Sequence, residues 1–261
     1  MKIRAPSVAG SFYPADANEL AATVVGLLDS VPNAVLQPKA IRALIVPHAG
    51  YIYSGFVAAT SYSCLKQLAQ GITRVVLLGP SHWVPLSGIA LADCNAFQTP
   101  IGDIPLDKML QQKLLNFDGV VVNNEAHIKE HSLEVQLPFL QEVLKDFILV
   151  PLVVGQCSPK IVADVLESLW RGDTLIIVSS DLSHYHSYAT AQQLDLETSQ
   201  QIERFDSNIH GRQACGCYAL NGLSLLARQK SLDIKRLALA NSADSEGDKE
   251  RVVGYGSYVL Q

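Results

Sequence analysis

The sequence predicts a single α/β domain over residues 1–261, with a mixed, mostly parallel central β-sheet and helices on both faces. Two features of the sequence support this fold class. Short apolar runs recur along the chain, and segments with helical periodicity separate them. Strands that alternate with helices are typical of layered α/β domains. No linker rich in Pro, Gly or Ser divides the chain, so one domain is the simpler organisation.

The predicted strands are four nearly unbroken apolar runs. They are rich in β-branched residues and bounded by Pro, Gly, Asp or Ser, which is the pattern of strands buried on both faces. These runs cover residues 41–46, 74–79, 147–154 and 174–179. The closing segment RVVGYGSYVL, residues 251–260, alternates along its length and predicts a further strand.

The predicted helices carry apolar residues that recur on one face. Asn18 is the expected N-cap of the first helix. Ser158 followed by Pro159 predicts the start of another, because proline is favoured in the first helical turn. A third apolar stripe covers residues 191–205. Pro138 lacks an N–H, so we expect the helix around it to begin late or to kink there.

Composition and charge exclude several classes of protein. The formal net charge is −5 and the basic residues are scattered, so we expect no nucleic-acid partner and no binding to an anionic membrane. No apolar stretch approaches the length of a membrane span, and the N-terminus lacks the apolar core of a signal peptide. The sequence therefore predicts a cytoplasmic protein.

The five cysteines form an irregular set, which favours free thiols over a disulfide framework. Cys215 and Cys217 form the only close pair in the sequence. One residue separates them, whereas zinc-finger and thioredoxin motifs place two residues between their cysteines. We therefore expect this pair to be structural.

Three predicted strands are each followed by a histidine. His48 follows the run that ends at residue 46, His82 the run that ends at 79, and His184 the run that ends at 179. The carboxyl ends of parallel strands share one edge of a sheet, where ligands bind, so these side chains should converge. A single histidine after a strand is usually a hydrogen-bonded loop residue, but three at corresponding positions favour a shared site.

A metal centre is the chemistry that this arrangement suits best. Neutral imidazole binds Zn, Fe, Cu and Ni, and two histidines with one carboxylate form a triad suited to Fe(II). We expect His48 and His82 to be the fixed ligands. Asp181 and His184 lie three residues apart and could act as an acid/base pair or orient the ligands.

The polar loop NSADSEGD, residues 241–248, is the expected source of a third ligand. It offers the carboxylates of Asp244, Glu246 and Asp248. A solvated turn is the alternative interpretation of this loop.

Other residues are candidates for the lining of the same pocket. His131 and Glu134 would share a helical face, although Ser132 could instead be an N-cap, with both neighbours tied to the backbone. Tyr51 and Ser81 lie next to the predicted ligands in the sequence. The chain contains neither a GxSxG nucleophile elbow nor a phosphate-binding GxxxxGK[ST] loop, which argues against a serine hydrolase and a nucleotide-driven enzyme.

Several longer motifs resemble the Memo family, whose bacterial and archaeal members are named AmmeMemoRadiSam system protein B. The resemblance covers nearly the whole chain. Its motifs are AGSFYP at 9–14, VPHAGYIYSG at 46–55, LLGPSHWVPLSGIAL at 77–91, EHSLEVQLPFL at 130–140, VPLVVG at 150–155, VSSDLSHY at 178–185 and VVGYGSYVL at 252–260. That family is similar in fold to the class III extradiol (LigB-type) dioxygenases, which cleave catechol rings with non-haem iron. The resemblance therefore implies a LigB-like fold.

The resemblance also implies roles for individual residues. His48 and His82 match metal-ligand positions. His184 matches the acid/base histidine of the dioxygenases, with Asp181 beside it. The implied cofactor is a divalent metal, Fe(II) first, with Zn or Cu as alternatives and a site without metal as a further one.

The third ligand position differs between the related families. The dioxygenases have a glutamate there, and eukaryotic Memo proteins have a cysteine. The residue of this chain that aligns with that position is Ser245. Because a serine hydroxyl is a poor ligand, either Ser245 would hold the metal weakly or a flanking carboxylate, Asp244 or Glu246, would take its place.

Three functions from different classes follow. The first is a metal-dependent, dioxygenase-like oxidoreductase, with the substrate left open. The second is a non-catalytic binding protein that holds a peptide or small molecule in the pocket at the sheet edge. The third is a zinc-dependent hydrolase. The family name further implies a functional association with a radical-SAM protein and an AMMECR1-type protein.

Overall fold

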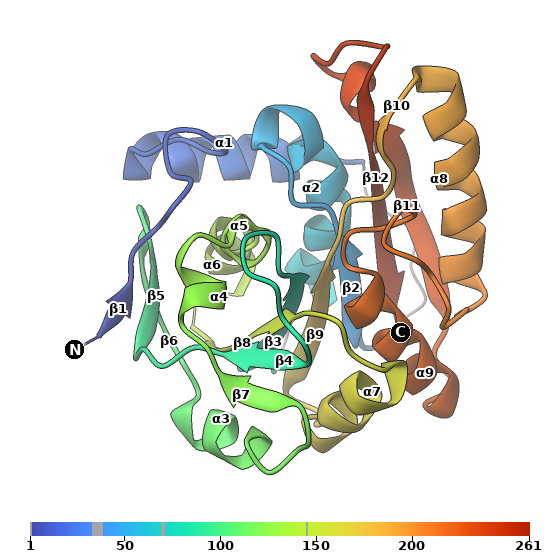
Figure 1. Ribbon diagram of the computed structural model, residues 1–261. Helices are drawn as coiled ribbons and strands as arrows, with labels where there is room; N and C mark the ends of the chain where they lie inside the picture. The colour runs from blue at the N-terminus through green and yellow to red at the C-terminus, as the bar shows by residue number, and fades with distance from the viewer. Residues whose placement is uncertain (1, 33–38, 69–70, 145) are drawn as a thin grey trace.

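The computed structural model describes residues 2–32, 39–68, 71–144 and 146–261. Over these residues the protein forms a layered α/β structure, in which helices cover both faces of a large β-sheet (Figure 1). This confirms the predicted fold class. A smaller sheet is formed by β1 (Ile3–Arg4), β5 (Ala96–Thr99) and β6 (Gly102–Pro105).

The large sheet has nine strands within the described residues. In spatial order they are β10 (His184–His186), β12 (Val252–Leu260), β2 (Ala43–Val46), β9 (Thr174–Ser179), β3 (Arg74–Pro80), β8 (Ile148–Val154), β4 (Ile89–Leu91) and β7 (Val120–Val122), and β11 (Ile234–Asn241) pairs with β12.

Four neighbouring strands at the centre of this sheet, β2, β9, β3 and β8, run parallel to one another. Antiparallel neighbours join on each side, with β12 beside β2 and β4 beside β8. The sheet is therefore mixed, as predicted, with a parallel centre. The central strands correspond to the four apolar runs, and the predicted closing strand is β12.

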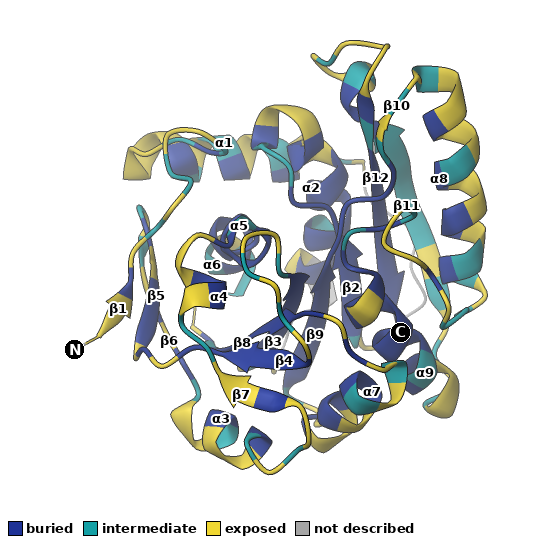
Figure 2. Ribbon diagram, in the orientation of Figure 1, coloured by how far each residue is buried: buried dark blue, intermediate teal, exposed yellow. Residues whose placement is uncertain are grey.

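The central strands are almost continuously apolar because their side chains alternate between two cores. In β2, Leu44 and Val46 belong to one core, whereas Ala43 and Ile45 belong to the other. Figure 2 shows these strands buried along their length. Because both faces of these strands are covered, only the edge at which the strands end is open to a ligand.

The helices divide between the two cores. Buried residues of the first core come from α1 (Ala17–Asp29), α2 (Tyr51–Leu68), α5 (His131–Glu134) and α6 (Leu137–Leu144). Those of the second come from α3 (Lys108–Leu114), α7 (Pro159–Ser168), α8 (Tyr188–Glu203) and α9 (Cys217–Gln229). Two short elements, α4 (Glu125–Ile128) and the 3₁₀ turn η1 (Ser242–Asp244), lie in connections.

Two of the predicted helix signals act as expected. The Ser158 hydroxyl accepts a hydrogen bond from the N–H of Ile161, and Pro159 is the first residue of α7. The helix around Pro138 begins late: α5 ends at Glu134, and α6 starts one residue before the proline.

The predicted cap of α1 is wrong by two residues. Asp16 is the N-cap, and its carboxylate accepts hydrogen bonds from the N–H groups of Asn18 and Glu19. Both residues have suitable side chains, and the position of the first buried turn selects the earlier one.

Among the described residues, no helix combines the length and apolar content that crossing a membrane requires.

Candidate metal centre

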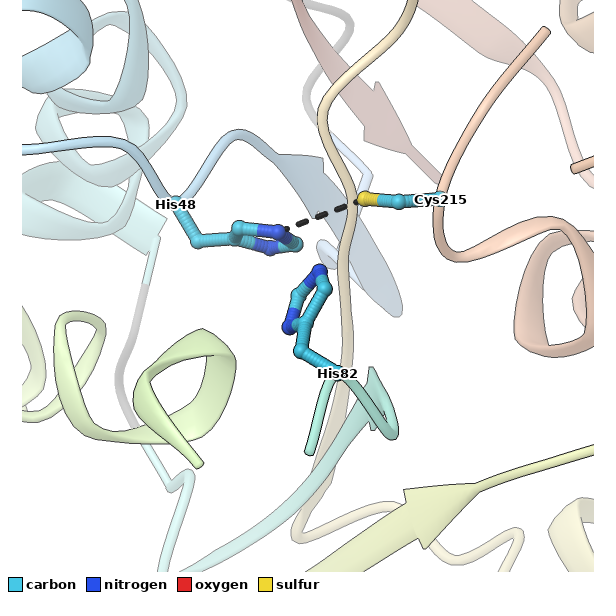
Figure 3. A group of neighbouring side chains, drawn as sticks. All are labelled: His48, His82 and Cys215. Atoms are coloured by element: carbon cyan, nitrogen blue, oxygen red, sulfur yellow. Dashed lines mark hydrogen bonds between the residues drawn. The ribbon is translucent and has the colours of Figure 1, made fainter. Parts of the chain in front are cut away.

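Three side chains from distant parts of the sequence meet at the carboxyl edge of the central strands. His48 lies two residues beyond β2, His82 two residues beyond β3, and Cys215 two residues before α9. Figure 3 shows the two imidazole rings and the sulfur pointing toward one another. One potential ligand atom from each residue lies within 4.8 Å of the other two. The edge expected to carry the site therefore does bring His48 and His82 together.

His48 is held rigidly from two sides. Its backbone N–H donates to Oδ1 of Asp181 at 2.7 Å, and its Nδ1 lies 2.9 Å from Oγ of Ser179. The side chain is buried, and burial together with His82 and His131 lowers the pKa of His48 well below its ordinary value. The ring is therefore neutral, which is the form that binds a metal.

His82 is oriented by a buried carboxylate. Oε1 of Glu130 lies 2.8 Å from Nδ1 of His82, and Oε2 accepts the backbone N–H of His82 at 2.7 Å. Burial lowers the pKa of His82, but the hydrogen bond and charge of Glu130 outweigh it, and the net shift is upward. A carboxylate behind the outer ring nitrogen of a histidine is the usual support for a metal ligand, and it leaves Nε2 for the metal.

Glu130 was not expected to belong to the site. Burial raises its pKa, but hydrogen bonds from His82 and from the N–H of Ser132 outweigh burial and lower the pKa to about 2. The carboxylate thus caps α5 and orients His82 at once. The motif EHSLE contained this residue, but the sequence did not indicate that His82 would be its partner.

Cys215 is the residue that the sequence interpretation missed. Its Sγ lies 3.3 Å from Nε2 of His48 and 3.3 Å from the backbone nitrogen of Asp181. Burial and the Asp181 carboxylate raise the pKa of this thiol, so it is protonated unless a cation replaces the proton. The expectation of a purely structural pair is therefore corrected for Cys215, whereas Cys217 is buried in the second core.

The position between the two cysteines, Gly216, can hold only a glycine. A Cβ on Gly216 would lie 2.7 Å from Cβ of Ser180 and 2.9 Å from the carbonyl oxygen of Ser179. Only glycine lets the chain approach the end of β9 this closely. The motif therefore reflects a tertiary contact that presents Cys215 to the site.

The 241–248 loop does not supply the third member of this group. The carboxylate of Asp244 accepts hydrogen bonds from the hydroxyl of Tyr188 and from the N–H of Asn241, and Asp244 joins no cluster of potential ligands among the described residues. The hydroxyl of Ser245 donates to the carbonyl of Ser242. Cys215, and not Asp244, is therefore the third potential ligand that the structure groups with His48 and His82, whereas Ser245 lines a neighbouring cavity.

Asp181 and His184 lie beside the group without joining it. Oδ2 of Asp181 is 3.9 Å from Nε2 of His48, and Oδ1 of Asp181 accepts a hydrogen bond from the backbone N–H of His48. Burial raises the pKa of Asp181 against the opposing effects of the His48 N–H and of His184. His184 begins β10 and is partly exposed.

His131 faces the site, whereas Glu134 does not. The ring of His131 stacks on that of His82 at 4.7 Å, and its Nδ1 lies 3.7 Å from Oε1 of Glu130. Glu134 is fully buried and accepts hydrogen bonds from Arg4 and from the backbone of Ser7. Glu134 therefore anchors the N-terminal segment and does not line the pocket.

The remaining two candidates have different positions. The hydroxyl of Tyr51 donates to the carbonyl of Val135 at 2.7 Å, and its ring lines a cavity near the site. The hydroxyl of Ser81 donates to the carbonyl of Val84 at 2.6 Å and stabilises the turn that carries His82. Ser81 thus supports a ligand-bearing turn.

The donor set fits a metal ion. Metal–nitrogen and metal–sulfur bonds of about 2.0–2.3 Å at tetrahedral angles place the two ligand atoms roughly 3.5 Å apart. The 3.3 Å between His48 Nε2 and Cys215 Sγ is close to that separation. Two imidazole nitrogens and a thiolate suit Zn, Cu and Fe better than Mg or Ca.

Comparisons with known proteins agree with the sequence motifs. The model of a family described as Memo-like protein matches residues 4–259. A MEMO1 family protein of Aquifex aeolicus is 34% identical over 98% of each chain, and one of Aeropyrum pernix is 35% identical, also over 98% of each. An uncharacterized protein of Escherichia coli K12, JW3007, has a crystal structure with a TM-score of 0.56, covering 84% of this chain and 99% of its own. At 12% identity that structure supports the fold alone. The family match and the full-length relatives together show that the chain belongs to the Memo family.

Proposed function

We propose that the protein is a metal-dependent oxidoreductase, similar in chemistry to the extradiol dioxygenases, with a metal ion held by His48, His82 and Cys215. The observation that carries this proposal is the convergence of three ligand atoms within 4.8 Å at the carboxyl edge of parallel strands. Both histidines bond through Nδ1 to another residue, so each has Nε2 left for a metal.

Fe(II) is the first candidate for the metal, because the family resembles the non-haem iron dioxygenases. The thiol of Cys215 makes Zn and Cu close competitors, since a sulfur ligand replaces the carboxylate of the usual facial triad. When bound, such a metal polarises a substrate oxygen and, in the case of iron or copper, can activate dioxygen. The chain supplies the ligands, their orientation and the groups that move protons.

Asp181 and His184 are the proposed proton-transfer pair. A carboxyl whose pKa is raised by burial can hold a proton at a higher pH than a free aspartate and release it to a neighbour. Its Oδ2 lies 3.9 Å from Nε2 of His48. His184 is partly exposed, so it can exchange protons with solvent. Asp181 would act inside the site and His184 at its rim.

A neutral, largely apolar molecule is the proposed ligand. A cavity of about 580 Å³ adjoins the site and is lined by uncharged residues, several of them aromatic. Phe12 lines this cavity and also contacts His131, with ring centroids 4.8 Å apart. Ile52 and Phe56 lie on its wall with 60% and 47% of their surfaces exposed, so this wall offers apolar surface to a ligand.

The same cavity supports a second candidate function. A non-catalytic binding protein would use the apolar wall formed by Ile52, Tyr53 and Phe56 to hold a peptide or metabolite, with the histidines as an anchoring point. The two candidates differ in whether a redox metal is needed. They can therefore be separated without knowledge of the substrate.

Metal analysis of the untagged protein, purified without chelators, tests the proposal. We expect close to one transition-metal ion per chain, and loss of that metal in His48→Ala, His82→Ala and Cys215→Ser. The matched control is His210→Ala, which removes an exposed histidine that belongs to no cluster of potential metal ligands among the described residues. Full metal occupancy in the three site variants would eliminate the proposed centre.

The identity of the metal separates the three functions. Iron or copper, together with oxygen consumption on addition of a reducing substrate, supports the oxidoreductase. Zinc without oxygen consumption supports a hydrolase with an open coordination position. A chain that takes up no metal but binds apolar ligands, with loss of binding in Phe56→Ser, supports the binding protein.

A further inference from the structure

A buried chain of hydrogen bonds leads from the ring of His48 into the protein core. Nδ1 of His48 lies 2.9 Å from Oγ of Ser179. The same oxygen lies 2.9 Å from Nε2 of Gln136 and 2.6 Å from the carbonyl oxygen of Ser132. All four residues are buried. The Ser179 hydroxyl thus has three hydrogen-bond partners, but with a single hydrogen it can donate to only one of them.

Two groups outside the site fix the orientation of Gln136. Nε2 of its amide lies 2.8 Å from the carbonyl oxygen of Pro47, and Oε1 accepts the hydroxyl of Tyr62 at 2.9 Å. A carbonyl oxygen can only accept, so the NH₂ end of the amide must face Pro47. That same NH₂ group faces Ser179, and Gln136 therefore donates to the serine hydroxyl.

The direction of the remaining bonds follows from counting protons. Ser179 has one hydroxyl hydrogen, and the carbonyl of Ser132 is an acceptor only. The hydrogen of Ser179 must therefore point to Ser132. The lone pairs of Oγ then accept from Gln136 and from His48, which requires a hydrogen on Nδ1 of His48.

We infer that Ser179 and Gln136 are positioning residues that select the tautomer of His48. With the hydrogen on Nδ1, the lone pair of Nε2 is directed at Cys215, whose Sγ lies 3.3 Å away. The opposite tautomer would place a hydrogen where a metal ion must bind. The consequence for metal binding rests on the proposed function, whereas the tautomer itself does not.

The tautomer can be measured in the metal-free protein. Long-range ¹H–¹⁵N correlation spectra of histidine rings separate a protonated Nδ1 from a protonated Nε2. We expect the Nδ1–H form for His48 in the unaltered chain, and loss of this fixed form in Ser179→Ala. An Nε2–H signal for His48 in the unaltered chain would overturn the inference, whatever metal the protein binds.

Metal affinity tests the consequence. We expect Ser179→Ala to weaken metal binding by about 10- to 100-fold, the usual cost of losing the partner of a ligand histidine. Ser61→Ala is the matched control, because Ser61 is also fully buried and its hydroxyl is bonded to Ser257 in α2–β12 packing, away from His48. Gln136→Met, which removes only a supporting donor, should have a smaller effect than Ser179→Ala.

The outcomes distinguish this inference from the proposed function. If the unaltered chain binds metal through His48 but Ser179→Ala behaves like Ser61→Ala, the positioning role is overturned and the metal centre stands. If the unaltered chain binds no metal, the proposed centre fails and with it the metal-related consequence. The ring spectra still decide the tautomer in that case.

Discussion

Nε2 of His48 lies 3.3 Å from Sγ of Cys215, although 167 residues separate the two along the chain. Asp181 holds them together. Its carboxylate accepts the N–H of His48, and its backbone carbonyl accepts the N–H of Cys215 at 3.2 Å. One residue at the end of β9 therefore fixes the backbone of two candidate ligands. The pair is a product of the tertiary fold and has no local motif.

Cys215→Ser should weaken metal binding by more than about 100-fold, because loss of a ligand costs more than the 10- to 100-fold loss of an outer partner. Competition with a chromophoric chelator measures this change. Cys217→Ala is the control, since Cys217 is buried in the second core and is not part of the group. The assignment fails if Cys215→Ser keeps its metal while Asp244→Asn loses it.

The central strands could be predicted because both faces are buried, so nearly every position is apolar. The short strands outside this centre could not. β4, β7 and β10 are only three residues long, and β10 has the sequence His-Tyr-His with no buried residue. Such strands are defined by their neighbours and carry no pattern of their own.

The convergence of His48 and His82 could be predicted from their shared place after strands, whereas that of Cys215 could not. It approaches the site from the turn before α9, so the rule for strand ends does not apply to it. Its partner contact depends on Gly216 packing against Ser180, which only the folded chain reveals. The role of Glu130 could not be predicted for the same reason, because its hydrogen-bond partner His82 lies 48 residues away in the sequence.

Metal affinity should rise with pH. Burial and Asp181 raise the pKa of the Cys215 thiol, so the metal must displace a proton from it near neutral pH. Release of one proton makes affinity increase roughly tenfold per pH unit. The raised pKa of His82 steepens the dependence at the acid end, since that ring must also be neutral. Calorimetric titrations in buffers of different ionisation enthalpy count the protons directly, and a pH-independent affinity would contradict this expectation.

Glu130 should make the fold sensitive to acid. Its pKa falls from 4.5 to about 2 on folding, so the carboxylate stabilises the folded state above pH 4.5, and this contribution is lost as the pH falls toward 2. Glu130→Gln should therefore be less stable at neutral pH and show a flatter loss of stability between these two values. Urea unfolding at several pH values measures the slope. Glu19→Gln, at an exposed position in α1, should keep the slope of the unaltered chain.

Glu134→Ala should destabilise the protein by about 3–5 kcal/mol, because it leaves the charge of Arg4 buried without its partner. Both residues are buried, and the carboxylate also accepts hydrogen bonds from Tyr13 at 2.6 Å and from the N–H of Val8 at 2.9 Å. Chemical denaturation measures the loss. Breaking the exposed pair of Lys160 with Asp164 by Asp164→Ala should cost no more than about 1 kcal/mol. Similar losses in the two variants would contradict the anchoring role of Glu134.

Gly216→Ala should disturb the metal centre although it changes no ligand. The added methyl group would lie 2.7 Å from Cβ of Ser180, closer than real Cβ contacts, so the turn that carries Cys215 must move. We expect weaker metal binding and a stability loss of about 1–3 kcal/mol. Gly211→Ala is the matched control, because nothing lies within 4 Å of a Cβ added there. The close contacts of Gly216 are with the end of β9, next to Asp181. A normal metal affinity in Gly216→Ala would therefore mean that Cys215 does not need this packing to reach His48.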